Sequence, residues 1–218
     1  MVIRLSNPNA EGLSQVNRTE NEVAAIHLTR LGLQSDEARA KLSDIVPVVY
    51  AWHPAGEDTG GFGWLVMDFK RGVALNEVFS ELSDEKTQDV VGQLADLFAG
   101  VQQAPLPDAL KGHYGGLTIA PAGEIVPGQA TTSTDGPWSD LAALRKSKLA
   151  TQLKTADESD LLRGWRESGL RDAIDEFASS GIDRLFAKAG IDVHAQGLIH
   201  GDFSMLFCVF IVCSCLLC

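Results

Sequence analysis

A short segment near the end of the chain carries the residues best suited to acid–base chemistry. His200, Gly201 and Asp202 follow the apolar pair Leu198-Ile199, which is typical of a short buried strand. A carboxylate just past such a strand can accept a proton from an attacking hydroxyl, so Asp202 is the candidate general base. His200 can brace the loop through its ring nitrogens. Taken alone, the triplet fits a turn whose Asp caps a helix better than it fits a catalytic loop.

The elements that must position this loop begin with a β-rich first third. β-branched and aromatic runs separated by turn residues indicate strands, and apolar residues at helical spacing indicate helices. The pattern predicts a strand over Val2–Leu5, helices over Arg18–Leu31 and Ser35–Leu42, and an antiparallel hairpin of Val46–Trp52 and Phe62–Phe69. Gly32 is expected to end the first helix and Ser35 to cap the second.

Helices dominate after Gly72. Ser83 is a good N-cap for the clearest of them, because Asp84 and Glu85 follow it at the positive end of the helix dipole. The expected elements are helices over 74–79, 83–103 and 138–153, a small hairpin of 117–119 and 124–126, and one or two helices between 161 and 189. This order indicates an α+β fold with a boundary near residue 70.

Composition excludes several classes of protein. The chain has 218 residues, and its hydrophobic fraction of 45% is ordinary for a globular protein. Its net charge of −11 is unfavourable for binding the phosphate backbone of nucleic acids. We therefore expect no nucleic-acid partner. The N-terminus lacks a signal-peptide pattern and no run reaches the ~20 apolar residues of a membrane span, so a cytoplasmic location is expected.

The loop is not an isolated match. The segment Leu198–Ser204 resembles the H-G-D-x-x-x-x-N catalytic loop of the aminoglycoside phosphotransferase and choline kinase-like family, which has a protein kinase-like fold. Val2–Leu5 resembles the strand whose basic residue contacts ATP phosphates, which implies that role for Arg4. Asn21–Ala25 resembles the helix whose acidic residue pairs with it, which implies Glu22. Without the resemblance, Arg4 is a solvated strand-end arginine and Glu22 an exposed helix residue.

The resemblance extends to the nucleotide hinge. Trp64–Phe69, followed by Gly72, is similar to the strand and hinge that hold the adenine, which implies binding through the backbone of Met67, Asp68 and Phe69. The expected fold is a two-lobe, protein kinase-like one. Its parts are an incomplete N-lobe at 1–70, a mostly helical C-lobe at 71–204 that ends in a partial catalytic loop, and a tail at 205–218. ATP and Mg are the implied cofactors, and a small hydroxylated molecule is the implied acceptor.

Parts of the family pattern are missing. No glycine-rich loop precedes Val2, and the position of the metal-binding asparagine holds Phe207, which cannot ligate a hard cation. The later acidic ligand would lie beyond Cys218. Because phosphoryl transfer depends on positioning and on neutralising phosphate charge, we expect no significant kinase activity from the chain as written and assign no metal ligand.

The tail has a composition unlike the rest. Met205–Cys218 is apolar except for Ser214 and holds all four cysteines, Cys208, Cys213, Cys215 and Cys218, without a second pair at zinc-site spacing. A truncated or mispredicted gene product explains such a tail most simply. The sequence thus predicts a fragment of an ATP-dependent small-molecule phosphotransferase. The alternatives are a non-catalytic, pseudokinase-like binding module and a nonfunctional truncated product.

Overall fold

The computed structural model describes residues 1–9, 15–132, 135–200, 209–211 and 215–217. Within these ranges the chain is a mixed α+β protein with small antiparallel sheets. Its contacts divide it into two compact units, one of residues 1–9, 18–108 and 197–218 and the other of 10–17 and 109–196. The boundary predicted near residue 70 falls inside the first unit, because the helices on its two sides pack against each other.

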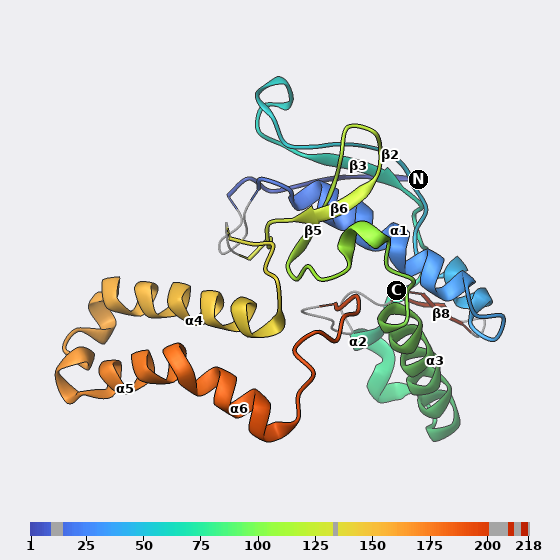
Figure 1. The fold of residues 1–218 in the computed structure, drawn as a ribbon. Coiled ribbons are helices and arrows are strands. Elements are labelled where there is room, and N and C mark those ends of the chain that lie inside the picture. The colour runs from blue at the N-terminus through green and yellow to red at the C-terminus, as the bar shows by residue number, and fades with distance from the viewer. Residues whose placement is uncertain (10–14, 133–134, 201–208, 212–214, 218) are drawn as a thin grey trace. The chain divides into compact units, whose positions relative to one another are not determined.

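The first unit is built on a three-stranded antiparallel sheet in the order β1-β3-β2 (Figure 1). The strands are β1 (Val2–Leu5), β2 (Val49–His53) and β3 (Trp64–Met67), so the predicted strand and hairpin are confirmed. β2 begins three residues later than expected. Pro47 has no N–H for a ladder, and the carbonyl of Val46 accepts a hydrogen bond from Arg30 (2.5 Å).

Helix α1 (Arg18–Gln34) packs against the sheet and against helix α3 (Asp84–Gln102). A Cβ on Gly32 would lie 2.6 Å from the carbonyl oxygen of Gly100 and 2.8 Å from the Cβ of Ala104, so this glycine allows the two backbones to approach. The prediction that Gly32 ends the helix is therefore wrong. The core beside this crossing is formed by Leu33, Ile45, Val46, Leu97 and Val101.

Ser35 ends a helix and does not begin one. Its hydroxyl donates to the carbonyl of Gly32 (2.8 Å), which satisfies an acceptor in the last turn of α1. The helix expected over Ser35–Leu42 is replaced by a 3₁₀ turn at Ala40–Asp44. Ser83, in contrast, caps α3 as predicted, since its hydroxyl accepts from the N–H of Lys86 (3.4 Å).

A second small sheet in this unit joins distant segments. Strand β4 (Val73–Ala74) pairs with β7 (Val209–Ile211), which pairs with β8 (Cys215–Leu217), all antiparallel. Helix α2 (Leu75–Val78) and a 3₁₀ turn at Phe79–Glu81 replace the single helix expected over 74–79. Parts of the apolar tail thus form strands. Its origin as a truncated or mispredicted gene product stays a prediction.

The second unit contains a hairpin and a helical arm. Strands β5 (Gly116–Ile119) and β6 (Ile125–Gly128) form the predicted hairpin, and Asn17 donates to the carbonyls of Leu117 (3.0 Å) and Gln129 (2.8 Å) beside it. Helix α4 (Leu141–Glu158) runs antiparallel to α5 (Leu170–Glu176) and α6 (Ile182–Ala189) (Figure 1). A π-helical segment at Phe177–Gly181 joins α5 to α6.

Helix α4 begins at its cap and not at Trp138. Asp140 accepts a hydrogen bond from the N–H of Ala143 (2.7 Å), while Trp138 exchanges two backbone hydrogen bonds with Tyr114. At the far end of the arm, Gly190 has a φ of 64° and closes α6, as the sequence predicts.

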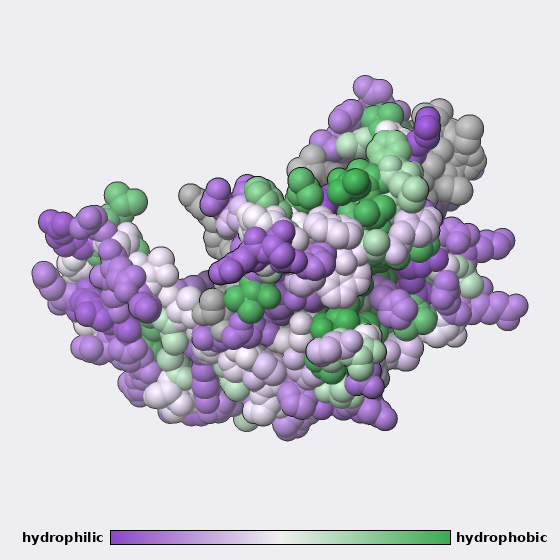
Figure 2. Space-filling model, turned by 90° about the horizontal axis from the view of Figure 1, so that it is seen from above, coloured by the Kyte–Doolittle hydropathy of each residue, from purple (hydrophilic) through white to green (hydrophobic). Residues whose placement is uncertain are grey.

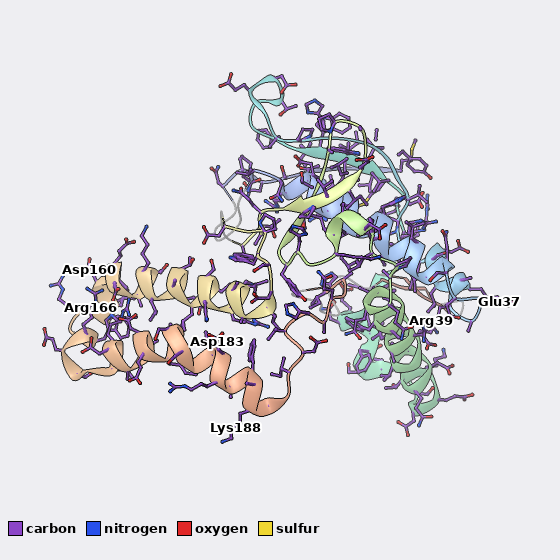
Figure 3. All side chains as sticks on the ribbon, viewed as in Figure 1. Glu37, Arg39, Asp160, Arg166, Asp183 and Lys188 are labelled. Carbon is purple, nitrogen blue, oxygen red and sulfur yellow. The ribbon has the colours of Figure 1, made fainter. Side chains whose placement is uncertain are left out.

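Acidic side chains of the helical arm pair with basic ones. Asp157 accepts two hydrogen bonds from Arg166 (2.6 and 2.5 Å) and also pairs with Arg171, whose guanidinium lies 5.9 Å from the ring centre of Trp165. Lys146 pairs with Asp183 (2.6 Å); Figure 3 labels Asp160, Arg166 and Asp183 along this arm. These pairs are typical of a solvated, charge-balanced helix surface.

Candidate functional site

The structure brings together the two residues predicted to clamp phosphate. Arg4 lies on β1 and forms an ion pair with Glu22, one turn into α1. Arg4 is the cross-strand partner of Leu65, which is only 2% exposed, so both lie on the sheet face that packs on α1. Half of the Arg4 side chain and a quarter of the Glu22 side chain remain exposed (50% and 24%), so the pair can be reached from solvent.

A pocket adjoins this ion pair. It is small, with room for about one water molecule, and it is open to solvent. All of its lining belongs to the first unit: Arg4, Ser6, Arg18, Thr19, Glu22, Gly63, Trp64 and Leu65. Two guanidinium groups face one carboxylate in this set. The lining of the pocket therefore carries a net positive charge, which attracts anions.

The floor of the pocket depends on a glycine. A Cβ on Gly63 would lie 2.0 Å from Oγ1 of Thr19, so no other residue fits while β3 is this close to the start of α1. The Ser6 hydroxyl accepts from the N–H of Gly63 (2.8 Å) and donates to its carbonyl (3.1 Å). These contacts hold the end of β1 against β3 and set the position of Arg4 two residues earlier.

Burial dominates the electrostatics of Glu22. It raises the pKa of this carboxyl above the ordinary value, and the guanidinium groups of Arg4 and Arg18 act in the opposite direction. Burial likewise raises the pKa of Glu20. A raised carboxyl pKa means that the folded chain holds the ionised Glu22 at a cost in stability, which is common where a charged group serves binding.

The predicted hinge residues lie where β3 ends. Met67 pairs with Val2 on one side and Val49 on the other, and Phe69 is 59% exposed. The Asp68 N–H donates to the carbonyl of Val48 (3.0 Å), so that donor is already used by the sheet. Adenine binding through this backbone stays a prediction.

The Asp68 side chain has a structural role that the sequence does not indicate. It accepts hydrogen bonds from the Tyr50 hydroxyl (2.6 Å) and the Val48 N–H (3.1 Å) and pairs with Lys70 (3.3 Å). The Tyr50 hydroxyl is the largest cause that lowers the pKa of Asp68, from 3.8 to about 2. The carboxylate thus ties β2 to the chain after β3.

Replacing Asp68 with Asn should therefore destabilise the protein in a pH-dependent way. Because the folded pKa lies below the unfolded one, the charge contributes stability above pH 3.8 that is lost as pH falls toward about 2. We expect the Tm of Asp68→Asn at pH 7 to be about 2–4 °C lower than that of the wild type, with the gap closing between pH 4 and 2. Circular-dichroism melts across this range test it, with the exposed Asp160→Asn as control; a gap independent of pH would contradict the assignment.

The predicted catalytic loop is described only in part. Leu198 packs against the core of the first unit, and Gly197 lies close to the carbonyl of Gln102, where a Cβ would be 3.0 Å away. His200 is exposed. Asp202 and Phe207 lie outside the described residues, so the roles predicted for His200 and Asp202 remain predictions.

Sequence reasoning found Arg4 and Glu22 but missed their neighbours. In the sequence, a strand end is all that is indicated at Ser6, a helix start at Arg18 and Thr19, and a turn at Gly63. The one available signal is the spacing of Arg18 and Glu22, which places them on the same side of α1.

Comparison with known proteins adds no further assignment: no family model, no curated protein and no solved structure matches the chain. None of the helices in the described ranges is long and apolar enough to cross a membrane. In the same ranges, no group of three or more His, Cys, Asp and Glu side chains is arranged to hold a metal ion.

Proposed function

We propose that this chain carries the phosphate-binding half of an ATP-dependent small-molecule phosphotransferase with a protein kinase-like fold. The ion pair between Arg4 and Glu22 is the observation that carries the proposal. In phosphotransferases of this type, a basic residue on a strand contacts the ATP phosphates and is oriented by a carboxylate on the following helix. The family resemblance of the catalytic loop supports the same assignment independently.

The topology of the first unit supports this proposal. Helix α1 connects β1 to β2, and β3 then inserts between them, so the strand that bears Arg4 is next to the strand that leads to the hinge. Arg4 and the predicted adenine-binding segment therefore belong to neighbouring strands, which supports binding of one nucleotide by both.

The pocket fits phosphate better than it fits a metal. Two arginines and a threonine hydroxyl are donors, and phosphate oxygens are acceptors. The magnesium of the family would need further oxygen ligands, and Phe207 occupies the asparagine position. In the proposed enzyme, which we place in the cytoplasm, Asp202 accepts the proton of the acceptor hydroxyl.

The substitution at position 207 favours a second candidate, a nucleotide-binding module without turnover. Both candidates require ATP binding and differ only in whether phosphate is transferred. With Phe207 in place, we expect binding without measurable hydrolysis. Release of phosphate above the background of an Asp202→Ala variant would favour the enzyme over the binding module.

A thermal-shift series tests the shared claim. ATP at ten times its Kd should raise the Tm by about 3–5 °C, because a ligand that binds only the folded state stabilises it by mass action. Adenosine at the same concentration should produce a much smaller shift, since it lacks the phosphates that Arg4 contacts. Equal shifts with ATP and adenosine, or a cooperative melt that ATP does not move, would overturn the proposal.

A further inference from the structure

The three-stranded sheet of the first unit has two edges, and they differ in how they are protected. At the β2 edge the register shifts between Val49 and Ala51, so Tyr50 forms a bulge, and Pro47 and Pro54 flank the strand. Bulges and prolines are devices with which natural sheets block an edge. Strand β1 forms the other edge, pairs with β3 alone in the described ranges, and contains neither device. The β1 edge is therefore open to another strand.

The backbone of β1 presents hydrogen-bonding groups at this edge. The Ser6 N–H donates to the carbonyl of Gly63, on the side of β3 (2.8 Å). The N–H and C=O groups of an antiparallel strand point alternately to its two sides. The groups of Arg4 and Ser6 therefore face β3, and those of Ile3 and Leu5 face away from it. Two donors and two acceptors thus lie along the outer edge at the spacing that a further antiparallel strand needs.

The side chains of Ile3 and Leu5 form an apolar stripe beside these groups. They are 66% and 61% exposed, and they lie on the sheet face opposite Arg4, because side chains alternate along a strand. Their cross-strand neighbours on that face are Val66 and Trp64, which are partly exposed as well. Exposed apolar side chains next to unpaired backbone groups favour the addition of a strand.

Charge makes a second copy of the same strand a suitable partner. Arg4 is the one ionisable side chain of β1, and Glu22 of the same unit pairs with it. The stripe on the opposite face carries no charge. Two chains, each with a net charge of −11, can thus meet at this strand without bringing acidic side chains of β1 together.

The residues of β1 also favour one register for a symmetric pair. A two-fold axis normal to the sheet keeps each face on its own side, so the symmetric registers are centred on a single residue. Centring on Arg4 would place two guanidinium groups directly opposite each other, and centring on Leu5 would place Ile3 opposite the polar Asn7. Centring on Ile3 pairs this residue with its own copy at a hydrogen-bonded position and places Arg4 opposite the apolar Val2.

We propose that two copies of this chain associate by antiparallel pairing of their β1 strands about Ile3, which joins the two sheets into one. The proposal does not rest on the proposed function, because it uses the edge and the outer face of the sheet and not the Arg4–Glu22 pair. Each copy contributes a strand of only four residues. The dimer is therefore weak, with a dissociation constant of about 1–100 μM.

Sedimentation of the full chain under reducing conditions tests the association. Wild type should change from monomer to dimer between about 1 and 100 μM. Ile3→Lys places a charge next to its own copy at the centre of the contact and should weaken the dimer at least about tenfold. Leu161→Lys, at a 96% exposed leucine of the second unit, is the matched control and should leave the dimer unchanged. Because both positions are exposed, the Tm of each variant should stay within about 2 °C of the wild type.

Amide hydrogen exchange of the wild type distinguishes edge pairing from other modes of association and needs no variant. At concentrations where the dimer forms, exchange of the Ile3 and Leu5 N–H groups should slow at least about tenfold relative to the monomer. The N–H groups of Arg4 and Ser6 should change much less, because they are directed to β3 in the monomer already.

Three results would overturn the proposal. A wild type that stays monomeric at about 100 μM would leave this edge to a strand of another protein. A dimer that Ile3→Lys does not weaken would have its contact elsewhere. Slower exchange confined to other strands, such as β7 and β8, would likewise place the contact away from β1.

Discussion

Replacing Arg4 with methionine should weaken ATP binding by at least about tenfold. Methionine keeps much of the length of the side chain and removes the planar donors, so the loss measures charge-assisted hydrogen bonds to phosphate, each contributing about 1.5–3 kcal/mol. Arg4→Lys should lose less, because it retains the charge without the fork. Calorimetric titration with ATP gives the affinities directly.

The fold should survive this substitution. Half of the Arg4 side chain is exposed, and surface ion pairs of this kind contribute little to stability. We therefore expect the Tm of Arg4→Met to fall by no more than about 2–4 °C, the equivalent of about 1 kcal/mol. The exposed Arg184→Met is a matched control for charge and should bind ATP as wild type does. Equal affinity of Arg4→Met and wild type would remove Arg4 from the phosphate site.

Gly32→Ala should be among the most destabilising small substitutions in the first unit. The added methyl group would lie 2.6 Å from the Gly100 carbonyl oxygen and within 2.9 Å of the Cα of Ala104, so backbone and not a flexible side chain blocks it. Forcing α1 away from α3 should lower the free energy of unfolding by about 2–3 kcal/mol. Urea unfolding followed by circular dichroism measures this change.

The same helix pair provides a control with the opposite sign. Gly92 is an exposed glycine within α3, and a Cβ there would meet no atom within 4 Å beyond the neighbouring backbone of its own helix. Gly92→Ala should therefore raise stability by about 0.5–1 kcal/mol through helix propensity. If both alanines stabilise the protein, the close approach of α1 and α3 at Gly32 is not present in solution.

The sequence predicted local structure well where local chemistry decides it. Ser83 followed by two acidic residues gave a correct helix start, and Gly190 a correct end. The strands of the sheet were also predicted, because β-branched and aromatic runs separated by turn residues are typical of strands. The helix start at Asp140 was not predicted. The sequence suggested Trp138, whose backbone instead pairs with that of Tyr114.

Tertiary contacts explain the errors. Gly32 and Ser35 are residue types typical of a helix end and of the start of a new helix. However, the close approach of α3 requires a glycine inside α1. Figure 2 shows hydrophobic patches on the surface. The exposed apolar side chains of the first unit include Ile3 and Leu5 on β1. β1 lies at the edge of its sheet, and edge strands with apolar side chains are a known route to self-association.

The candidate site was half predictable. The Arg4–Glu22 pair followed from family resemblance, whereas the contributions of Arg18 and Thr19 depend on how β3 meets the first turn of α1. No sequence pattern reports that contact, because Gly63 and Thr19 are 44 residues apart in the numbering and neither is unusual alone.

The most direct measurement is an NMR titration of arginine side chains with ATP. The Nε–H resonances of Arg4 and Arg18, assigned through their lysine variants, should shift together and saturate at one equivalent, while those of Arg163 and Arg184 stay in place. Saturable shifts confined to other arginines, or no shift of Arg4 at ATP concentrations that change the Tm, would contradict phosphate binding at this pocket.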